Sequence, residues 1–182
     1  MKNSGECDYN HKLVKYIVME FIDGIELYQY LCHAGRMEER KAKFLFKHIL
    51  KGLLALHNKG VVHRDIKLEN ILVRKNSGLP VIIDLGFAAS ISGDSPGGYF
   101  EKSFCGSYNY MAPELHQCIP YKGTEVDFFA LGICLFTMAV GNPPFNTARE
   151  DNKLYRSIAA NKTDVFWTFH LKRRPNGVND LS

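Results

Sequence analysis

The chain has 182 residues, of which 46% are apolar and 23% are charged. This composition is ordinary for a globular protein and excludes wholesale disorder. The length suits one domain, or a piece of one, and is too short for two. The net charge of +4 comes from 23 basic and 19 acidic residues without long runs of one sign. So mild a balance excludes the strongly basic classes of nucleic-acid-binding protein.

Two further bulk features concern the compartment. The five cysteines form no CxxC pair and no zinc-like spacing with histidine, and the first residues lack the apolar stretch of a signal peptide. We therefore expect reduced thiols and a cytoplasmic protein, with a nuclear location also open. The longest mostly apolar run, residues 128–140, favours a buried helix, because a membrane span needs about 20 apolar residues. We expect neither a membrane nor a nucleic-acid partner.

The first predicted elements are a strand and two helices. Residues 12–22 are rich in β-branched and aromatic side chains and predict a strand, which the Asp-Gly pair at 23–24 ends. Helices are predicted over residues 26–34 and 38–59, separated by Gly35. In the second helix, apolar side chains recur at three- and four-residue steps, and we assign this stripe to the core.

A short polar segment lies between two apolar ones after the second helix. It reads His63-Arg64-Asp65-Ile66-Lys67-Leu68-Glu69-Asn70. It brings a proton acceptor, a fixed positive charge and a metal-coordinating amide carbonyl into one small loop. Phosphoryl transfer needs these three groups, because the nucleophile must be aligned, the negative charge offset and a divalent cation held. Taken alone, such a charged stretch is more often a solvated surface loop.

The later part of the chain predicts a hairpin, a mobile segment and two helices. The turn is expected at residues 74–78 and the returning strand at 80–83. Asp84-Leu85-Gly86 follows this strand, and a segment with a Gly/Ser-rich centre then runs to Ala112-Pro113-Glu114. A helix-start pattern at Thr124 predicts a long buried helix to Val140, and residues 150–160 predict a short one.

Three of these motifs, in this order and spacing, resemble the eukaryotic protein kinases. They are the loop around Asp65, the Asp-Leu-Gly at 84–86 and the Ala-Pro-Glu at 112–114. Lys67 is typical of the serine/threonine type. The ending Cys-Gly-Ser-x-Asn-Tyr-x-Ala-Pro-Glu is most similar to the calcium/calmodulin-dependent and AMP-activated branch.

The resemblance implies an α+β, protein-kinase-like fold. It would consist mostly of the helical large lobe, with the hinge strand of the small lobe, and be truncated at both ends. Residues 1–11 would be an N-terminal remnant and residues 12–182 a partial kinase domain. No Gly-x-Gly-x-x-Gly occurs in the sequence, so we expect the hinge strand to lack sheet neighbours.

The resemblance also implies an activity and a set of site residues. The protein would transfer the γ-phosphate of ATP to Ser/Thr hydroxyls of protein substrates, with Mg²⁺. Asp65 and Lys67 would be catalytic, and Asn70 and Asp84 would bind the metal. Leu85 would keep the apolar anchor of the family's Phe without its ring. Met19 would line the adenine pocket, and main-chain groups of Glu20 and Ile22 would read the adenine. The remaining nucleotide contacts are assigned to Glu26 and Leu72.

Regulation and support follow from the same match. Ser103, 11 residues before Glu114, would carry an activating phosphate from an upstream kinase, bound with the help of Arg64. The rivals are Ser92, Ser95 and Tyr99. Ser107 matches a hydroxyl that contacts the catalytic loop. Asp127 would hold the backbone of that loop, and Glu114 is a further structural residue that the family pairs with an arginine.

Two further expectations concern substrate and function. Glu26 and Glu69 would face the peptide and favour Arg before the acceptor. A catalytically inactive, kinase-like interaction module is the alternative function, since the phosphate-covering glycine motif is absent from the sequence.

Overall fold

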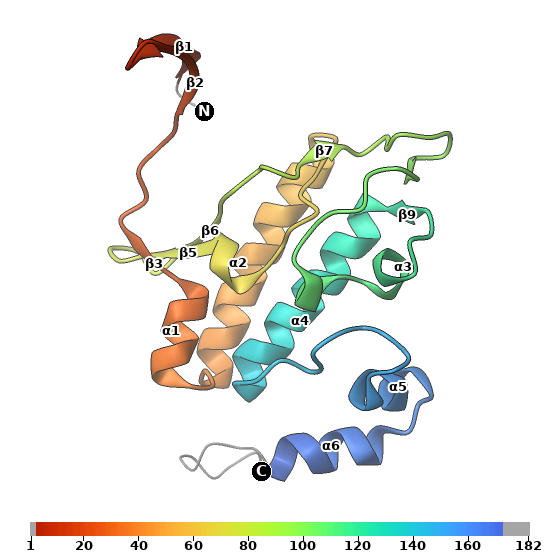
Figure 1. Cartoon of the computed structure of the whole chain (residues 1–182). Helices are drawn as coiled ribbons and strands as arrows, with labels where there is room; N and C mark the ends of the chain where they lie inside the picture. Colours follow the sequence, from red (N-terminus) through yellow and green to blue (C-terminus); the bar gives the residue numbers. More distant parts are fainter. Residues whose placement is uncertain (1–2, 173–182) are drawn as a thin grey trace.

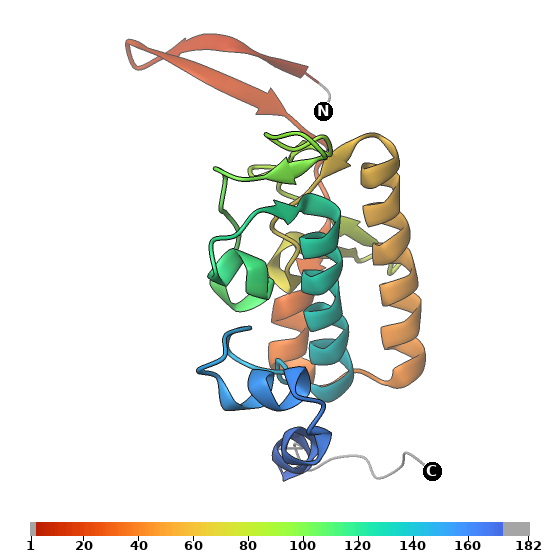
Figure 2. The same ribbon diagram turned by 90° about the vertical axis from the view of Figure 1, so that its right-hand side faces the viewer.

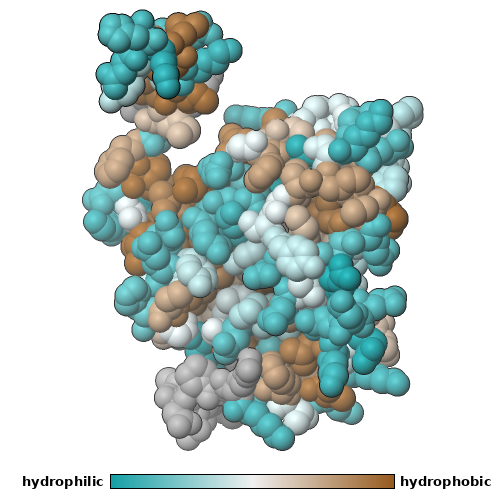
Figure 3. All heavy atoms as spheres, in the orientation of Figure 1, coloured by the Kyte–Doolittle hydropathy of each residue, from teal (hydrophilic) through white to brown (hydrophobic). Residues whose placement is uncertain are grey.

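The computed structural model describes residues 3–172. The chain begins with an antiparallel hairpin of β1 (Asn3–Tyr9) and β2 (Lys12–Val18), in register from Asn3 opposite Val18 to Tyr9 opposite Lys12. Asn10 and His11 form its two-residue turn with φ of 52° and 62°, the backbone of a type I′ turn. The hairpin projects from the body on an extended link (Figure 1), and its apolar residues lie on the surface (Figure 3).

This hairpin corrects two expectations. The predicted strand 12–22 ends at Val18, and residues 19–23 form no regular element. The strand also has a sheet neighbour, because every residue of β2 pairs with one of β1. The segment Asn3–Tyr9 contains Asn, Ser, Gly and Asp, which have low strand propensity, so that only the pairing with β2 makes it a strand.

A small antiparallel sheet follows, with the strand order β3 (Gly24–Glu26), β5 (Ile71–Arg74), β6 (Pro80–Ile82). Glu26 lies opposite Leu72, and Leu72 lies opposite Val81. The β5–β6 hairpin confirms the predicted turn and returning strand.

Three helices surround the main core: α1 (Leu27–Ala34), α2 (Glu39–Asn58) and α4 (Gly123–Val140). All three were predicted, with ends that differ by at most one residue. Helix α2 packs against α4 and β6, and Figure 2 shows α2 and α4 side by side. The core is apolar and includes Leu27, Leu45, Ile49, Leu53, Leu131 and Met138. Gly141, with φ of 87°, ends α4 by donating its N–H to the carbonyl of Thr137.

Helix α4 contains the apolar run 128–140. By length and composition alone it is apolar enough to cross a membrane, with a mean hydropathy of 1.5 over 18 residues. A buried core helix passes the same test, and α4 carries Asp127 buried in its second turn and packs against α2.

The remaining elements are short. Strand β4 (Val61–Val62) pairs with β7 (Ala89–Ser90), and β8 (Tyr99–Phe100) pairs with β9 (Tyr121–Lys122). The 3₁₀ turns η1 (Leu68–Asn70) and η2 (Tyr108–Tyr110) and helix α3 (Pro113–His116) connect them. Helices α5 (Lys153–Ala159) and α6 (Thr163–Lys172) close the described part.

The helix predicted at 150–160 starts later than expected. The side-chain oxygen of Asn152 accepts hydrogen bonds from the amides of Leu154 and Tyr155 and so caps α5. The end of the predicted domain, residues 173–182, lies outside the described residues.

Candidate active site

A buried carboxylate in α4 anchors the loop around Asp65. Asp127 is 1% exposed. Its Oδ1 accepts the amide of Arg64 at 2.7 Å, and its Oδ2 accepts the amide of His63 at 2.9 Å. The same Oδ2 lies 2.8 Å from Nε2 of His57, near the end of α2. Asp127 therefore ties the loop to two core helices.

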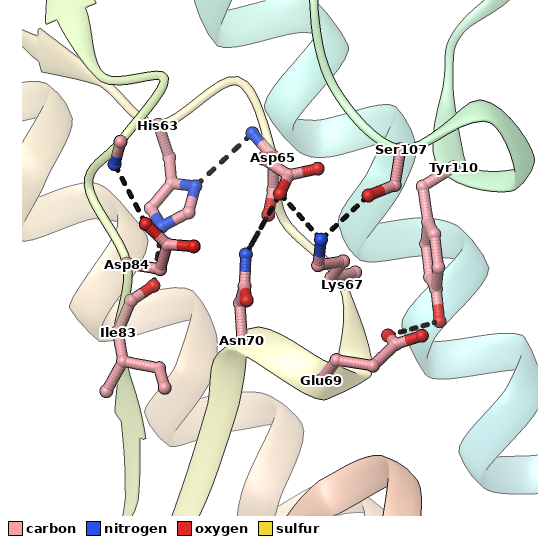
Figure 4. Close-up of polar contacts among 10 residues, drawn as sticks. His63, Asp65, Lys67, Glu69, Asn70, Ile83, Asp84, Ser107 and Tyr110 are labelled. Atoms are coloured by element: carbon pink, nitrogen blue, oxygen red, sulfur yellow. Dashed lines mark hydrogen bonds and ion pairs between the residues drawn. The ribbon is translucent and has the colours of Figure 1, made fainter.

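Asp65 lies at the centre of the site (Figure 4) and is 5% exposed. Its Oδ2 is 2.8 Å from Nζ of Lys67 and accepts from Nδ2 of Asn70 at 3.1 Å. Its Oδ1 is buried and has no hydrogen-bond partner within residues 3–172. One carboxylate oxygen is thus fixed by the loop, and the other is left unused.

The protonation of Asp65 follows from these contacts. Burial alone would raise the pKa of its carboxyl, but the adjacent Lys67 ammonium and the neighbouring polar groups of Ser107 outweigh this, so that the pKa lies below its ordinary value. Asp65 is therefore an anion at neutral pH and can accept a hydrogen bond.

Lys67 joins the loop to the segment before α3. Its Nζ donates to Oγ of Ser107 at 2.8 Å while contacting Asp65 (Figure 4). The approach is close, because a Cβ on Gly106 would lie 2.7 Å from the carbonyl oxygen of Arg64. Gly106 also has φ of 114°, which favours glycine.

His63 joins the loop to the strand before Asp84. The amide of Asp65 donates to Nδ1 of His63 at 3.3 Å, so Nε2 must carry the proton and donate to the carbonyl of Ile83 at 3.1 Å. Asp84 follows directly, with φ of 63°, and its Oδ1 accepts the amide of Gly86. The loop and Asp84 are therefore held in one frame.

The oxygens of Asn70 and Asp84 fit a magnesium ion. Both hydrogen bonds of the Asn70 side chain are donated by its nitrogen, to the backbone and side chain of Asp65, which leaves the amide oxygen available. Among residues 3–172 no group of three or more His, Cys, Asp or Glu side chains could hold a metal. Magnesium suits this poor donor set, because it usually takes one or two protein carboxylates and completes its shell with phosphate and water oxygens.

Leu85 is 55% exposed among the described residues, and its role as an apolar anchor stays a prediction.

The hinge residues lie in an irregular segment between β2 and β3. Met19 is 70% exposed, and Glu20 forms an ion pair with Arg74 at 2.8 Å. Ile22 is half-buried. Only Glu26 and Leu72 are brought together, as partners in the sheet.

Arg64 contacts the predicted phosphosite. Its Nη1 donates to Oγ of Ser103 at 2.9 Å and to the hydroxyl of Tyr121 at 3.3 Å, and its Nε donates to the carbonyl of Phe87. The guanidinium also lies over the ring of Phe100. Glu114, in contrast, has no ion pair with any of the described residues.

Sequence reasoning gave no role to several residues of the site. His57 and His63 make buried polar contacts with partners 70 and 20 residues away, and Tyr110 donates to Glu69 at 3.2 Å. A histidine directly at the end of an apolar stretch, as both His57 and His63 are, was the available signal.

The fold and the loop have the arrangement of the large lobe of a kinase domain. The chain matches the protein kinase domain over residues 7–180. It is 40% identical over 147 residues to mouse sperm motility kinase 2B, covering 81% of this chain and 29% of that protein. It is 41% identical over 140 residues to a probable serine/threonine-protein kinase 2 of Plasmodium falciparum, covering 75% and 26%.

A third relative is human NUAK family SNF1-like kinase 1, at 39% identity over 144 residues, covering 79% of this chain and 21% of that protein. The chain belongs to the protein kinase domain family. It spans less than a third of the length of these curated relatives.

Proposed function

We propose that this chain is part of a serine/threonine protein kinase that transfers the γ-phosphate of ATP to protein hydroxyls. The observation that carries the proposal is Asp65, whose buried Oδ1 has no partner within residues 3–172 while Lys67 and Asn70 hold its Oδ2. An anionic acceptor kept in place and left unused at one oxygen suits the alignment of an incoming hydroxyl.

The residues of the loop have separate tasks in this proposal. Asp65 accepts the hydrogen bond, and then the proton, of the substrate hydroxyl at Oδ1. Lys67 places its charge beside the transferred group and keeps Oδ2 occupied, so that the acceptor cannot rotate freely. Ser107 fixes Lys67 from the other side. The substrate segment would lie between the loop and residues 106–107.

Asn70 and Asp84 would hold magnesium, which supplies positive charge against the phosphates when it is bound. The nucleotide base and ribose would contact Glu26 and Leu72, with Met19, Glu20 and Ile22 as the adenine-reading group that the resemblance assigns.

The test is Asp65→Asn in the full-length protein, with Glu125→Gln, an exposed acid on α4, as the control. Transfer of labelled phosphate to a Ser/Thr peptide should fall by about 10² to 10⁴-fold in the first variant only. Unchanged transfer would refute the role of Asp65. A full-length wild type that binds ATP and transfers nothing would instead favour the inactive interaction module.

We further propose that an upstream kinase phosphorylates Ser103. The Ser103 hydroxyl already lies on Nη1 of Arg64, so a phosphate there would gain charge-assisted hydrogen bonds. In the full-length protein, Ser103→Ala should stay at basal activity after treatment with an upstream kinase, and Ser95→Ala should rise like the wild type. Equal activation of all three proteins would show that another residue is the switch.

We also propose that the substrates carry Arg before the acceptor residue. Glu69 lies on the catalytic loop, and no described basic side chain forms an ion pair with it, which would suit a guanidinium. A peptide library should therefore favour Arg two or three residues before Ser or Thr. The Glu69→Gln variant should show a weaker preference for Arg at these positions. Enrichment of acidic residues at these positions would contradict it.

A further inference from the structure

The net positive charge of the chain is concentrated in one region. Residues 36–59 contain seven basic and two acidic residues, whereas the rest of the chain contains sixteen basic and seventeen acidic ones. The two acids, Glu38 and Glu39, lie at the start of this region, and no acid follows before Asp65. The region therefore differs in charge from the rest of the molecule.

The basic residues of α2 form a line on its outer face. Arg40, Lys43, Lys47 and Lys51 follow one another at three- and four-residue steps, which places them on one side of a helix. All four are exposed. At 1.5 Å per residue the line is about 16 Å long. We call these four residues the basic stripe.

The stripe faces away from the core. The buried residues of α2 are Ala42, Leu45, Ile49 and Leu53, which lie on the opposite side of the helix and pack against the core. Figure 2 shows α2 at the outer edge of the molecule, with α4 on its inner side. No described element covers the stripe.

The stripe is poorly neutralised by its own chain. Lys43 forms an ion pair with Glu39 on the same face. Among the described residues, Arg40, Lys47 and Lys51 have no carboxylate partner. Two large apolar side chains share the face, Phe44 at 44% and Leu54 at 40% exposure. The face thus offers four cations and two apolar contact points.

We propose that the basic stripe is a docking surface for an acidic segment of a partner protein. Such a segment would place carboxylates at three- or four-residue steps over the cations and an apolar side chain on Phe44 or Leu54. The proposal concerns a surface on the far side of α2 from the catalytic loop, and it does not rest on the proposed activity.

An acidic peptide fits this surface better than other anionic partners do. A helix that binds a bilayer needs a free apolar face, and the apolar face of α2 is in the core. A nucleic acid would extend past a line about 16 Å long onto a remainder of the chain that carries a net negative charge.

The test uses the full chain and a fluorescein-labelled helical peptide with glutamates at three- and four-residue steps and one leucine, with a Gln-for-Glu peptide as the neutral probe. The stripe variant is Lys43→Glu with Lys47→Glu and Lys51→Glu. The control variant makes the same charge change elsewhere, with Lys12→Glu, Lys102→Glu and Lys162→Glu at exposed positions. Circular dichroism checks that both variants keep the helical content of the wild type.

Fluorescence anisotropy should show binding of the acidic peptide to the wild type that weakens between about 0.05 and 0.5 M salt. The stripe variant should lose affinity by about tenfold or more, and the control variant by less than about threefold. Phe44→Ala should weaken the binding that persists at high salt. If a stripe variant were to unfold, Lys47→Gln with Lys51→Gln provides the same comparison without charge reversal.

Three results would overturn the proposal. One is the absence of binding to the acidic peptide, and another is an equal loss in the stripe and control variants. The third is binding of vesicles with anionic lipids, or of duplex RNA, through the stripe while the peptide fails to bind, which would assign the surface to a different partner.

Discussion

The catalytic loop and the N-terminal hairpin of this chain differ in how they are held. Polar contacts from α4 and the segment before α3 fix the loop, and Asp127, which makes two of them, also contacts His57 of α2. The β1–β2 hairpin pairs with itself, and its large apolar side chains are exposed, Leu13 to 73%. The difference teaches that a loop of polar residues can be more rigid than a regular hairpin, because tertiary partners decide its stability.

The residues of the proposed function also fall into a well-held group and an exposed group. The groups that would accept the hydroxyl and hold the metal lie in the well-held part, on Asp65, Asn70 and Asp84. The groups that would read adenine, Met19 to Ile22, lie in the link to the hairpin. Under the proposed function, the groups assigned to phosphate chemistry are therefore preorganised in this chain, and those assigned to adenine recognition are not.

The largest expected effect comes from removing the Asp127 carboxylate, which holds the loop but not the hairpin. Asp127→Ala leaves three buried donors without their acceptor and should lower the free energy of unfolding by about 4 kcal/mol. Glu125→Ala, at an exposed position two residues before Asp127 in α4, should change it by less than about 0.5 kcal/mol. Urea unfolding of the chain measures both. A loss of under about 1 kcal/mol for Asp127→Ala would mean that the anchor is unimportant.

A second pair compares core and hairpin with the same chemical change. Leu53→Ala empties a fully buried site between α2 and the core and should cost about 3 kcal/mol. Leu13→Ala removes the same atoms from the exposed hairpin and should cost less than about 0.5 kcal/mol. Thermal melting with denaturant unfolding checks the pair. Similar costs at the two sites would show that the hairpin packs against the body.

The smallest expected effect concerns the charge of Asp65. The Lys67 ammonium and the neighbouring Ser107 outweigh burial and lower its pKa, so its anionic form stabilises the fold above the ordinary Asp pKa of about 3.9. This contribution disappears as the pH falls through the lower, folded-state pKa. The stability difference between the wild type and Asp65→Asn should be about 1 kcal/mol at neutral pH and should shrink as the pH falls below the ordinary Asp pKa and through the lower folded-state pKa. A difference that grows on acidification would contradict the sign.

The spacing of apolar residues and the helix-start residues made the large helices predictable from the sequence. The stripe of α2 and the helix-start signal of α4 are local, so their ends were found within one residue. Strand β1 and the two-residue strands β4, β7, β8 and β9 were missed, because such strands exist only through partners that are distant in sequence. The end of β2 was misplaced because apolar residues continue past Val18, with Met19, Phe21 and Ile22 following it.

The contacts of the site likewise divide into those that a local motif predicts and those between residues distant in sequence. Asp65, Lys67 and Asn70 lie within six residues, so a local motif suffices to predict that they meet. The bond of His57 to Asp127 spans 70 residues and that of Tyr110 to Glu69 spans 41, and neither has a local pattern. Ser103 could be placed beside Arg64 only through a family resemblance, since 39 residues separate them.

Hydrogen exchange of individual backbone amides tests the central claim, that the catalytic loop is held by Asp127 while the hairpin is held only by itself. In the wild-type chain the amides of His63 and Arg64, both bonded to Asp127, should exchange about a hundredfold or more slower than the hydrogen-bonded amides of β1 and β2. Asp127→Asn should speed the first pair and leave the hairpin unchanged. Equal protection of loop and hairpin in the wild type would contradict the account.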